Sequence, residues 1–286
     1  MKQLHSVTAL TGALLLLLAV ASLPAQTTAP STTSIPPAAT APAVSTPVPA
    51  EVDQSTPILP ESRDDSDWWI SRHQEKVARI KKGNVDLLFI GDSITHQWET
   101  EDKDDPSANY LPIWQEYYGD RNAVNLGVSG DETQEVLWRF AHGELDGISP
   151  KAAVVMIGTN NTARHPKWTA ADDLSGVLAV VEDLHRRLPQ TKILLLAIFP
   201  SKVRPEKSAK DQIINTDLQS IYAGSSYVQF LDIGDIFRKN GEPDPSLYHD
   251  KTGKCLHPNV TGQRKWAEAI EPTISQMLGD KNKLTK

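Results

Sequence analysis

Short apolar runs recur along the chain, and most of their residues follow one another without polar alternation. The runs cover residues 85–90, 123–126, 152–157, 193–198 and 227–231. Runs of this length and pattern are typical of strands that are buried on both faces, as in parallel sheets. We therefore expect five strands in a mainly parallel sheet.

Around these runs, apolar residues recur every three or four positions, which predicts amphipathic helices. The stripes are formed by Trp69, His73, Val77 and Ile80; by Val136, Leu137 and Phe140; by Leu174, Val177, Leu178, Val181, Leu184 and Leu188; and by Ile270, Ile274 and Met277. We expect Gly83 to end the first helix, Asp131 to cap the second, and Pro272 to kink or restart the last. The alternation of strands and helices predicts an α/β domain.

The first 25 residues have the pattern of a secretory signal peptide. Lys2 precedes an apolar run from Val7 to Val20, and small residues follow, with cleavage expected after Ala21 or Ala25. The run is shorter than the roughly 20 residues that span a bilayer, so we favour cleavage over a retained membrane anchor. This predicts a secreted or periplasmic protein with no stable membrane span after cleavage.

Residues 26–61 are rich in Pro, Thr, Ser and Ala and have few large apolar side chains. Such a segment cannot bury enough apolar surface to offset its ordering entropy, so we expect a disordered linker. The linker would lead into one domain over residues 62–280, followed by a tail over residues 281–286.

Composition narrows the function classes. Asp and Glu number 36 against 29 Lys and Arg, a net charge of −7, which argues against nucleic acid as the partner. The single Cys excludes an intramolecular disulfide and any multi-cysteine metal site. We expect no cofactor.

Candidate catalytic residues follow the ends of the predicted strands. Ser93 follows the first strand, Gly127 the second and Asn160 the third, and His257 lies at some distance after the fifth. Loops at the carboxyl ends of parallel strands form the ligand site of such sheets, so these four residues are expected on one rim. Each also has a purely structural interpretation, as a helix cap, a turn residue or a loop histidine.

Together the four residues suit acyl transfer. A serine hydroxyl is a weak nucleophile that needs a nearby base, and His257 would supply it to Ser93. The charge that develops on the attacked carbonyl needs fixed donors. The N–H of Ser93, the N–H of Gly127 and the side-chain amide of Asn160 are three candidates.

Four sequence blocks resemble those of the SGNH (GDSL-type) hydrolases, and they occur in the same order. The blocks are Phe89-Ile90-Gly91-Asp92-Ser93-Ile94-Thr95, Asn125-Leu126-Gly127-Val128-Ser129-Gly130-Asp131, Gly158-Thr159-Asn160-Asn161, and Leu256-His257-Pro258-Asn259 followed by Gly262. The resemblance runs from about Trp68 to Leu278. Residues 84–86 and 117–127 are most similar to the branch that includes the platelet-activating-factor acetylhydrolase catalytic subunits.

The resemblance implies a flavodoxin-like sandwich, with helices on both faces of a five-stranded parallel sheet. It implies hydrolysis of an ester through an acyl-serine intermediate, with Ser93 as nucleophile and His257 as base. Ser93, Gly127 and Asn160 would form the oxyanion hole. In the flavodoxin-like order the first and third strands are neighbours, which would bring Ser93 beside Asn160.

One position departs from the family pattern. The family has Asp three residues before the histidine, where this chain has Lys254. A lysine cannot fix the imidazole tautomer or stabilise the imidazolium. Three interpretations stay open: a backbone carbonyl orients His257 in a Ser–His dyad, Asp250 substitutes for the acid, or turnover is weak or absent.

The sequence therefore predicts a secreted serine esterase that removes small acyl groups, such as O-acetyl, from carbohydrates. One alternative is an esterase of short-chain lipids or lysophospholipids, which an apolar surface near Ser93 would favour. An open polar cleft with an exposed Trp would favour the carbohydrate. The other alternative is a non-catalytic carbohydrate- or surface-binding protein, which Lys254 keeps open.

Overall fold

The computed structural model describes residues 56–285. The signal peptide and most of the linker, predicted for residues 1–25 and 26–61, lie outside this range. None of the helices within it is long and apolar enough to cross a membrane.

Five parallel strands form the central sheet, as predicted. They are β1 (Leu87–Gly91), β2 (Ala123–Asn125), β3 (Ala152–Met156), β4 (Lys192–Leu196) and β5 (Val228–Leu231), in the order β2-β1-β3-β4-β5. In the register, Gly91 lies opposite Met156, so the carboxyl ends of β1 and β3 are level. The expectation that the first and third strands are neighbours in the sheet is confirmed.

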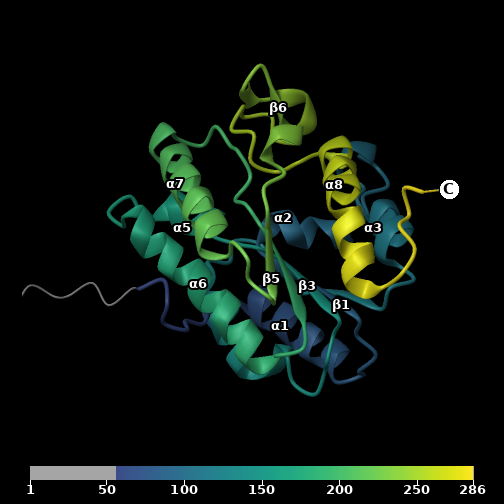
Figure 1. The fold of residues 1–286 in the computed structure, drawn as a ribbon. Helices are drawn as coiled ribbons and strands as arrows, with labels where there is room; N and C mark the ends of the chain where they lie inside the picture. Colours follow the sequence, from purple (N-terminus) through teal and green to yellow (C-terminus); the bar gives the residue numbers. More distant parts are fainter. Residues whose placement is uncertain (1–55, 286) are drawn as a thin grey trace, which may run out of the picture. The chain divides into compact units, whose positions relative to one another are not determined.

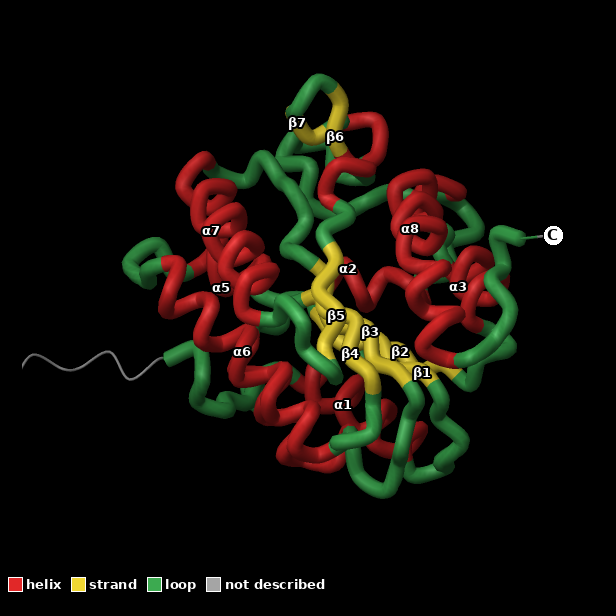
Figure 2. Tube along the Cα trace, viewed as in Figure 1, coloured by secondary structure: helices red, strands yellow, loops and turns green. Residues whose placement is uncertain are grey.

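Helices cover both faces of the sheet (Figures 1 and 2). They are α1 (Asp67–Ile80), α2 (Ser93–His96), α3 (Leu111–Tyr118), α4 (Thr133–Arg139), α5 (Thr159–Arg164), α6 (Ala170–Arg187), α7 (Pro205–Ile221) and α8 (Val260–Leu278). A short hairpin of β6 (Arg238–Lys239) and β7 (Glu242–Pro243) follows β5.

Two cores fill the space between the layers. Leu88 and Ile90 of β1 pack on one side with α4, α6 and α7, whereas Leu87 and Phe89 pack on the other with α3 and α8. Successive residues of a strand point to opposite faces, so a strand buried on both sides must be apolar throughout. This explains the continuous apolar runs and confirms the three-layer α/β fold.

One local expectation is wrong, and another is wrong in part. Glu132, not Asp131, caps α4 in a capping box with Glu135, because the Asp131 side chain is buried and bonded elsewhere. Pro272 does not restart α8, which is one helix from Val260 to Leu278. Ile270 and Ile274 pack into the same core on either side of the proline and hold the helix together.

Packing also begins earlier than residue 62. Pro57 is buried, and its carbonyl accepts a hydrogen bond from Thr133 Oγ1 at 2.7 Å. The amide of Glu61 donates to the carbonyl of Gln134. The last residues assigned to the linker therefore belong to the folded domain.

Candidate active site

Ser93 is the first residue of α2 and directly follows the turn that ends β1. Asp92 caps this helix by accepting from the amide of Ile94 at 2.9 Å. The turn requires glycine at position 91, since a Cβ there would lie 2.3 Å from Thr95 Oγ1 and 2.4 Å from the Met156 carbonyl. The tight turn therefore places the hydroxyl of Ser93 at the carboxyl end of the sheet.

His257 reaches Ser93 from the loop before α8. Its Nε2 lies 2.8 Å from Ser93 Oγ, within hydrogen-bond distance. The Tyr110 hydroxyl donates to the carbonyl of Pro258, and the amide of His249 donates to the carbonyl of His257. Burial lowers the pKa of His257 below its ordinary value, while the charge of Asp250 acts in the opposite direction. The imidazole is thus held neutral, as a general base must be.

Asp250 lies beside this loop, and its carboxylate is bonded to the backbone and to Thr252. It accepts from Thr252 Oγ1 at 2.8 Å, the Lys254 amide at 2.9 Å and the Leu256 amide at 2.9 Å. Within residues 56–285, none of its hydrogen bonds reaches the His257 ring. Asp250 therefore folds the loop that carries the histidine, and its influence on the ring is through charge.

Asn160 lies on α5, one residue after the start of the helix that follows β3. Its Nδ2 donates to the carbonyl of Asp131 at 2.8 Å. A primary amide has two N–H donors, so this bond orients the side chain and leaves the second donor.

Gly127 does not have the free donor that its predicted role requires. Its N–H already donates to Asn125 Oδ1 at 2.8 Å, and its carbonyl accepts from Arg72. A Cβ at this position would lie 2.5 Å from the amide nitrogen of His96. The absence of a side chain at Gly127 thus allows its loop to lie close to α2.

Gly130, three residues further on, is the better candidate, and the sequence analysis missed it. It adopts a φ of +82°, and within the described part of the chain its N–H makes no hydrogen bond. It directly precedes Asp131, whose carbonyl holds Asn160. The signal was present, as a second glycine in the Gly127-to-Asp131 block.

A buried chain of ionic groups lies behind this loop. Asp131 accepts from Trp69 Nε1 at 2.7 Å and from Arg139 Nε at 2.8 Å. Arg139 also pairs with Glu144, which is 2.9 Å from His73 Nδ1. This buried ionic chain links α1 to Asp131, the residue that holds Asn160. Nothing in the sequence pattern indicated it.

Asp92 is fully buried beneath Ser93. Burial raises the pKa of Asp92 to about 7. Its Oδ2 has no hydrogen-bond partner among residues 56–285. A protonated carboxyl fits this environment, because an ion there would be uncompensated.

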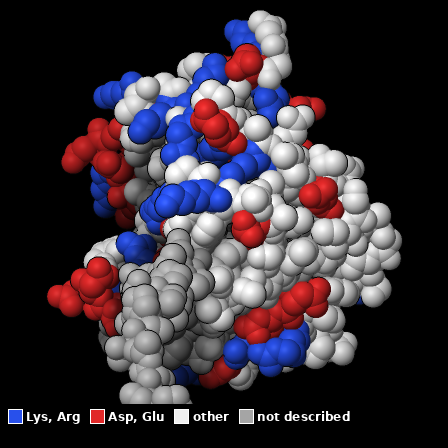
Figure 3. All heavy atoms as spheres, turned by 90° about the vertical axis from the view of Figure 1, so that its left-hand side faces the viewer, with Lys and Arg blue, Asp and Glu red and all other residues white. Residues whose placement is uncertain are grey.

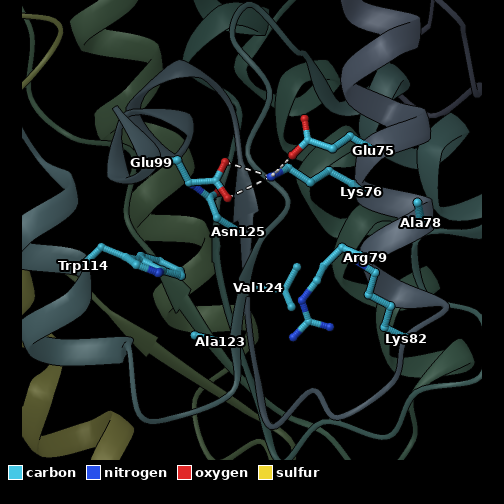
Figure 4. A pocket seen from close by; sticks show the side chains of 10 residues that line it. All are labelled: Glu75, Lys76, Ala78, Arg79, Lys82, Glu99, Trp114, Ala123, Val124 and Asn125. Carbon is cyan, nitrogen blue, oxygen red and sulfur yellow. Dashed lines mark hydrogen bonds and ion pairs between the residues drawn. The ribbon is translucent and has the colours of Figure 1, made fainter. Parts of the chain in front are cut away.

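Within the described residues, neither a metal centre nor the cavity beside β2 competes with this site as the catalytic centre. In the part of the chain that the structure describes, no group of three or more His, Cys, Asp and Glu side chains is placed to hold a metal. A cavity of about 320 Å³ opens beside β2 and α1, and Ser93, Asn160 and His257 do not line it (Figure 4). In this cavity Lys76 Nζ is already bound by both carboxylate oxygens of Glu99.

Known proteins are similar to this chain in sequence. The GDSL-like Lipase/Acylhydrolase family matches residues 89–265, more than half of the chain. Platelet-activating factor acetylhydrolase IB subunit alpha2 of Rattus norvegicus is 33% identical over 234 residues, covering 79% of this chain and 93% of that protein. The alpha1 subunit of Homo sapiens is 31% identical over 214 residues, covering 73% and 84%.

Solved structures share the fold. A GDSL-like lipase from Bacteroides thetaiotaomicron has a TM-score of 0.56 at 17% identity, covering 72% of this chain and 97% of that one. A carbohydrate acetylesterase from Sinorhizobium meliloti has a TM-score of 0.52 at 15% identity, covering 68% and 100%. The chain belongs to the GDSL-like lipase/acylhydrolase family and is a carboxylic ester hydrolase.

Proposed function

We propose that Ser93 and His257 cleave acetyl esters of carbohydrates through an acyl-serine intermediate. The observation that carries this proposal is the 2.8 Å contact between Ser93 Oγ and His257 Nε2. The imidazole takes the hydroxyl proton as Ser93 Oγ bonds to the acyl carbon, and returns it to the departing alcohol. Water, activated by the same imidazole, then releases the acid and restores Ser93.

In this proposal three donors stabilise the oxyanion. They are the free helix-terminal N–H of Ser93, the second N–H of Asn160 Nδ2 and the N–H of Gly130. Gly130 replaces Gly127 in this proposal because the Gly127 donor is bonded to Asn125.

In this proposal the imidazole acts without a carboxylate bonded to its ring, since no carboxylate of residues 56–285 makes such a bond. Asp250 folds the His257 loop and contributes charge, while Lys254 is exposed and its amide bonds to Asp250. We therefore infer a Ser–His dyad with Asp250 as a positioning residue.

Polar and aromatic surroundings support a carbohydrate. Trp68 is 48% exposed, and its ring stacks on His96, three residues after Ser93. The guanidinium groups of Arg63 and Arg164 face Gly130. Figure 3 shows the face that carries α5 and α7, where Lys and Arg side chains cluster among Asp and Glu. An exposed aromatic ring and polar neighbours suit a sugar better than an acyl chain.

Sequence similarity favours a second candidate, an acetyl ester of a lipid. The relatives that are 33% identical over most of the chain are named platelet-activating factor acetylhydrolases. Both candidates share a small acyl group, so they differ in the alcohol that leaves.

The first test is hydrolysis of p-nitrophenyl acetate by the wild type, Ser93→Ala and His257→Ala. We expect each substitution to lower kcat by roughly a thousandfold or more, as in triad enzymes. Ser226→Ala, an exposed serine away from the site, is the matched control. A folded wild type without activity on this ester or on acetylated polysaccharide would instead favour a binding protein.

The second test compares acetylated xylo-oligosaccharides with a 2-acetyl glycerophospholipid. A kcat/KM at least tenfold higher on the sugars supports the carbohydrate, and the reverse supports the lipid.

Secretion, which the first 25 residues lead us to propose, is tested by the mass of the protein recovered outside the cytoplasm. Cleavage after Ala21 or Ala25 is the expected result.

A further inference from the structure

A second, larger cavity lies on the β5 side of the sheet. Its volume is about 720 Å³, in the size range of ligand sites. Its walls come from the loop after β4, one face of α7, the segment after β5 and the β6–β7 hairpin. Figure 1 shows α7 to the left of the chain that leaves β5 and the hairpin above it. We call this cavity the distal groove.

The lining of the distal groove is mainly polar, and charges of both signs are present. The polar side chains include those of Ser201, Gln212, Asn215, Asp232, Arg238 and Glu242. Ser201 exposes only 6% of its surface, and its Oγ has no hydrogen-bond partner within residues 56–285. A buried hydroxyl without a partner costs free energy unless a ligand or water satisfies it.

This lining selects a class of ligand. Hydroxyl, amide and carboxylate groups together supply donors and acceptors for a polyhydroxylated molecule. Carboxylates at Asp232, Asp235 and Glu242 outnumber the one guanidinium, Arg238, which disfavours phosphates and other anions. The apolar part of the lining is small, namely Ile198, Pro200, Ala209 and Pro243, and it offers a lipid acyl chain little surface to pack against.

The distal groove lies on the same rim of the sheet as Ser93. Ser93 follows β1 and Asn160 follows β3, while the groove begins at the ends of β4 and β5. Neighbouring strands are about 4.8 Å apart, so two to three strand spacings place the groove roughly 10–15 Å from Ser93. That separation suits a chain of a few sugar units rather than a single one.

Two hydrogen bonds join the groove wall to the loop of the catalytic histidine. The amide of Lys202 donates to the carbonyl of Lys254 at 2.6 Å. The Tyr248 hydroxyl donates to the carbonyl of Pro200 at 2.9 Å. The wall that presents Ser201 is therefore fixed relative to His257.

We propose that the distal groove is a sugar-binding subsite, which holds a remote part of an acetylated oligosaccharide or polysaccharide while Ser93 acts on one acetyl group. This inference rests on the proposed carbohydrate specificity of the same site. It adds that the natural substrate is a chain of sugars. Binding energy from remote units then helps to position the ester at Ser93.

The experiment measures kcat/KM on acetylated oligosaccharides of two and six units. Three backbones are used: xylose, N-acetylglucosamine and galacturonic acid. For at least one backbone we expect the hexamer to exceed the dimer at least tenfold in the wild type. In Gln212→Ala/Glu242→Ala, and in Ser201→Leu, which narrows the groove, we expect this ratio to fall close to one. Gln229→Ala, an exposed glutamine of β5 that does not line the groove, keeps the ratio.

Each failure has a distinct signature. If sugars are cleaved with no gain from chain length, or if both groove variants keep the gain, the subsite is absent and the proposed function stands. If no sugar ester is cleaved while p-nitrophenyl acetate is, the carbohydrate specificity itself is wrong and the subsite with it.

Discussion

Ser93 and His257 are 164 positions apart in the chain, and Ser93 Oγ and His257 Nε2 are 2.8 Å apart in the fold. The serine is placed by a strand-to-helix turn and the histidine by a loop that Asp250 folds. The two residues of the proposed dyad therefore depend on different local structures, which can be perturbed separately.

The pH dependence of hydrolysis reports on His257. Burial lowers the pKa of His257, and the neutral ring is the active form, so kcat/KM on p-nitrophenyl acetate rises with pH through a midpoint below 6.5. In Asp250→Asn the negative charge that favours the imidazolium is lost, so the midpoint moves to lower pH. A midpoint that stays in place or moves up would contradict the charge effect.

Asp250→Asn also separates a loop-folding role from that of a triad acid. The Lys254 amide bonds to Oδ1 and the Leu256 amide bonds to Oδ2, so an asparagine side chain keeps an acceptor for only one of these two amides. We expect kcat to fall less than about a hundredfold, whereas loss of a triad acid costs roughly 10⁴-fold. A loss of the larger size would assign Asp250 to the ring of His257.

Asp92 makes stability depend on pH. Burial raises its pKa to about 7, so the folded state binds a proton that the unfolded state releases near pH 4. Stability therefore falls as pH rises from about 4 to about 7 and is level above. Asp92→Asn removes the contribution of this group, up to about 4 kcal/mol, and makes the curve of urea midpoint against pH less steep. Glu135 and Asp173, whose pKa values burial raises to about 7 and about 6, still contribute to the slope. Asp65→Asn, at an exposed carboxylate, leaves the slope as in the wild type.

The buried ionic chain contributes to both folding and catalysis. Arg139→Met leaves the carboxylates of Asp131 and Glu144 uncompensated, which costs about 3–5 kcal/mol in urea unfolding. Trp69→Phe removes one donor to Asp131 and costs about 1–3 kcal/mol. Because Asp131 holds Asn160, Trp69→Phe also lowers kcat on p-nitrophenyl acetate roughly tenfold. Trp114→Phe, at a buried ring in the core on the other face of the sheet, is the matched control.

The two glycines of the loop after β2 respond differently to alanine. At Gly127 a Cβ meets the backbone of Thr95 and His96 at 2.8 and 2.5 Å, so α2 must shift and Ser93 with it. At Gly130 it meets the flexible ends of Arg63 and Arg164 at 3.1 and 3.2 Å. We expect Gly130→Ala to fold with a loss of about 1–2 kcal/mol from its positive φ, and Gly127→Ala to lose far more in thermal unfolding.

The fold is most predictable from the sequence where one physical rule dominates. Burial of a sheet on both faces demands apolar strands, so the strands were readable directly. The strand order that the resemblance implied then made neighbours of the first and third strands, whose carboxyl ends precede Ser93 and Asn160. The role of Asp131 was not readable, because a polar residue before a helix normally indicates a cap. The Asp131 side chain is buried because Trp69 and Arg139, which lie on other elements, donate hydrogen bonds to it. The donor of Gly127 was misjudged for a similar reason, since the Asn125 side chain takes it within the same loop.

The bond between Trp69 and Asp131 also bears on where the catalytic unit begins. The family match starts at residue 89, on the first strand, yet the loop that orients Asn160 is held by a side chain twenty residues earlier. Pro57, further upstream, anchors Thr133, the first residue of the helix that follows this loop. A shortened chain starting at residue 85 would keep every strand and every reacting atom, and would leave the oxyanion side of its centre without support.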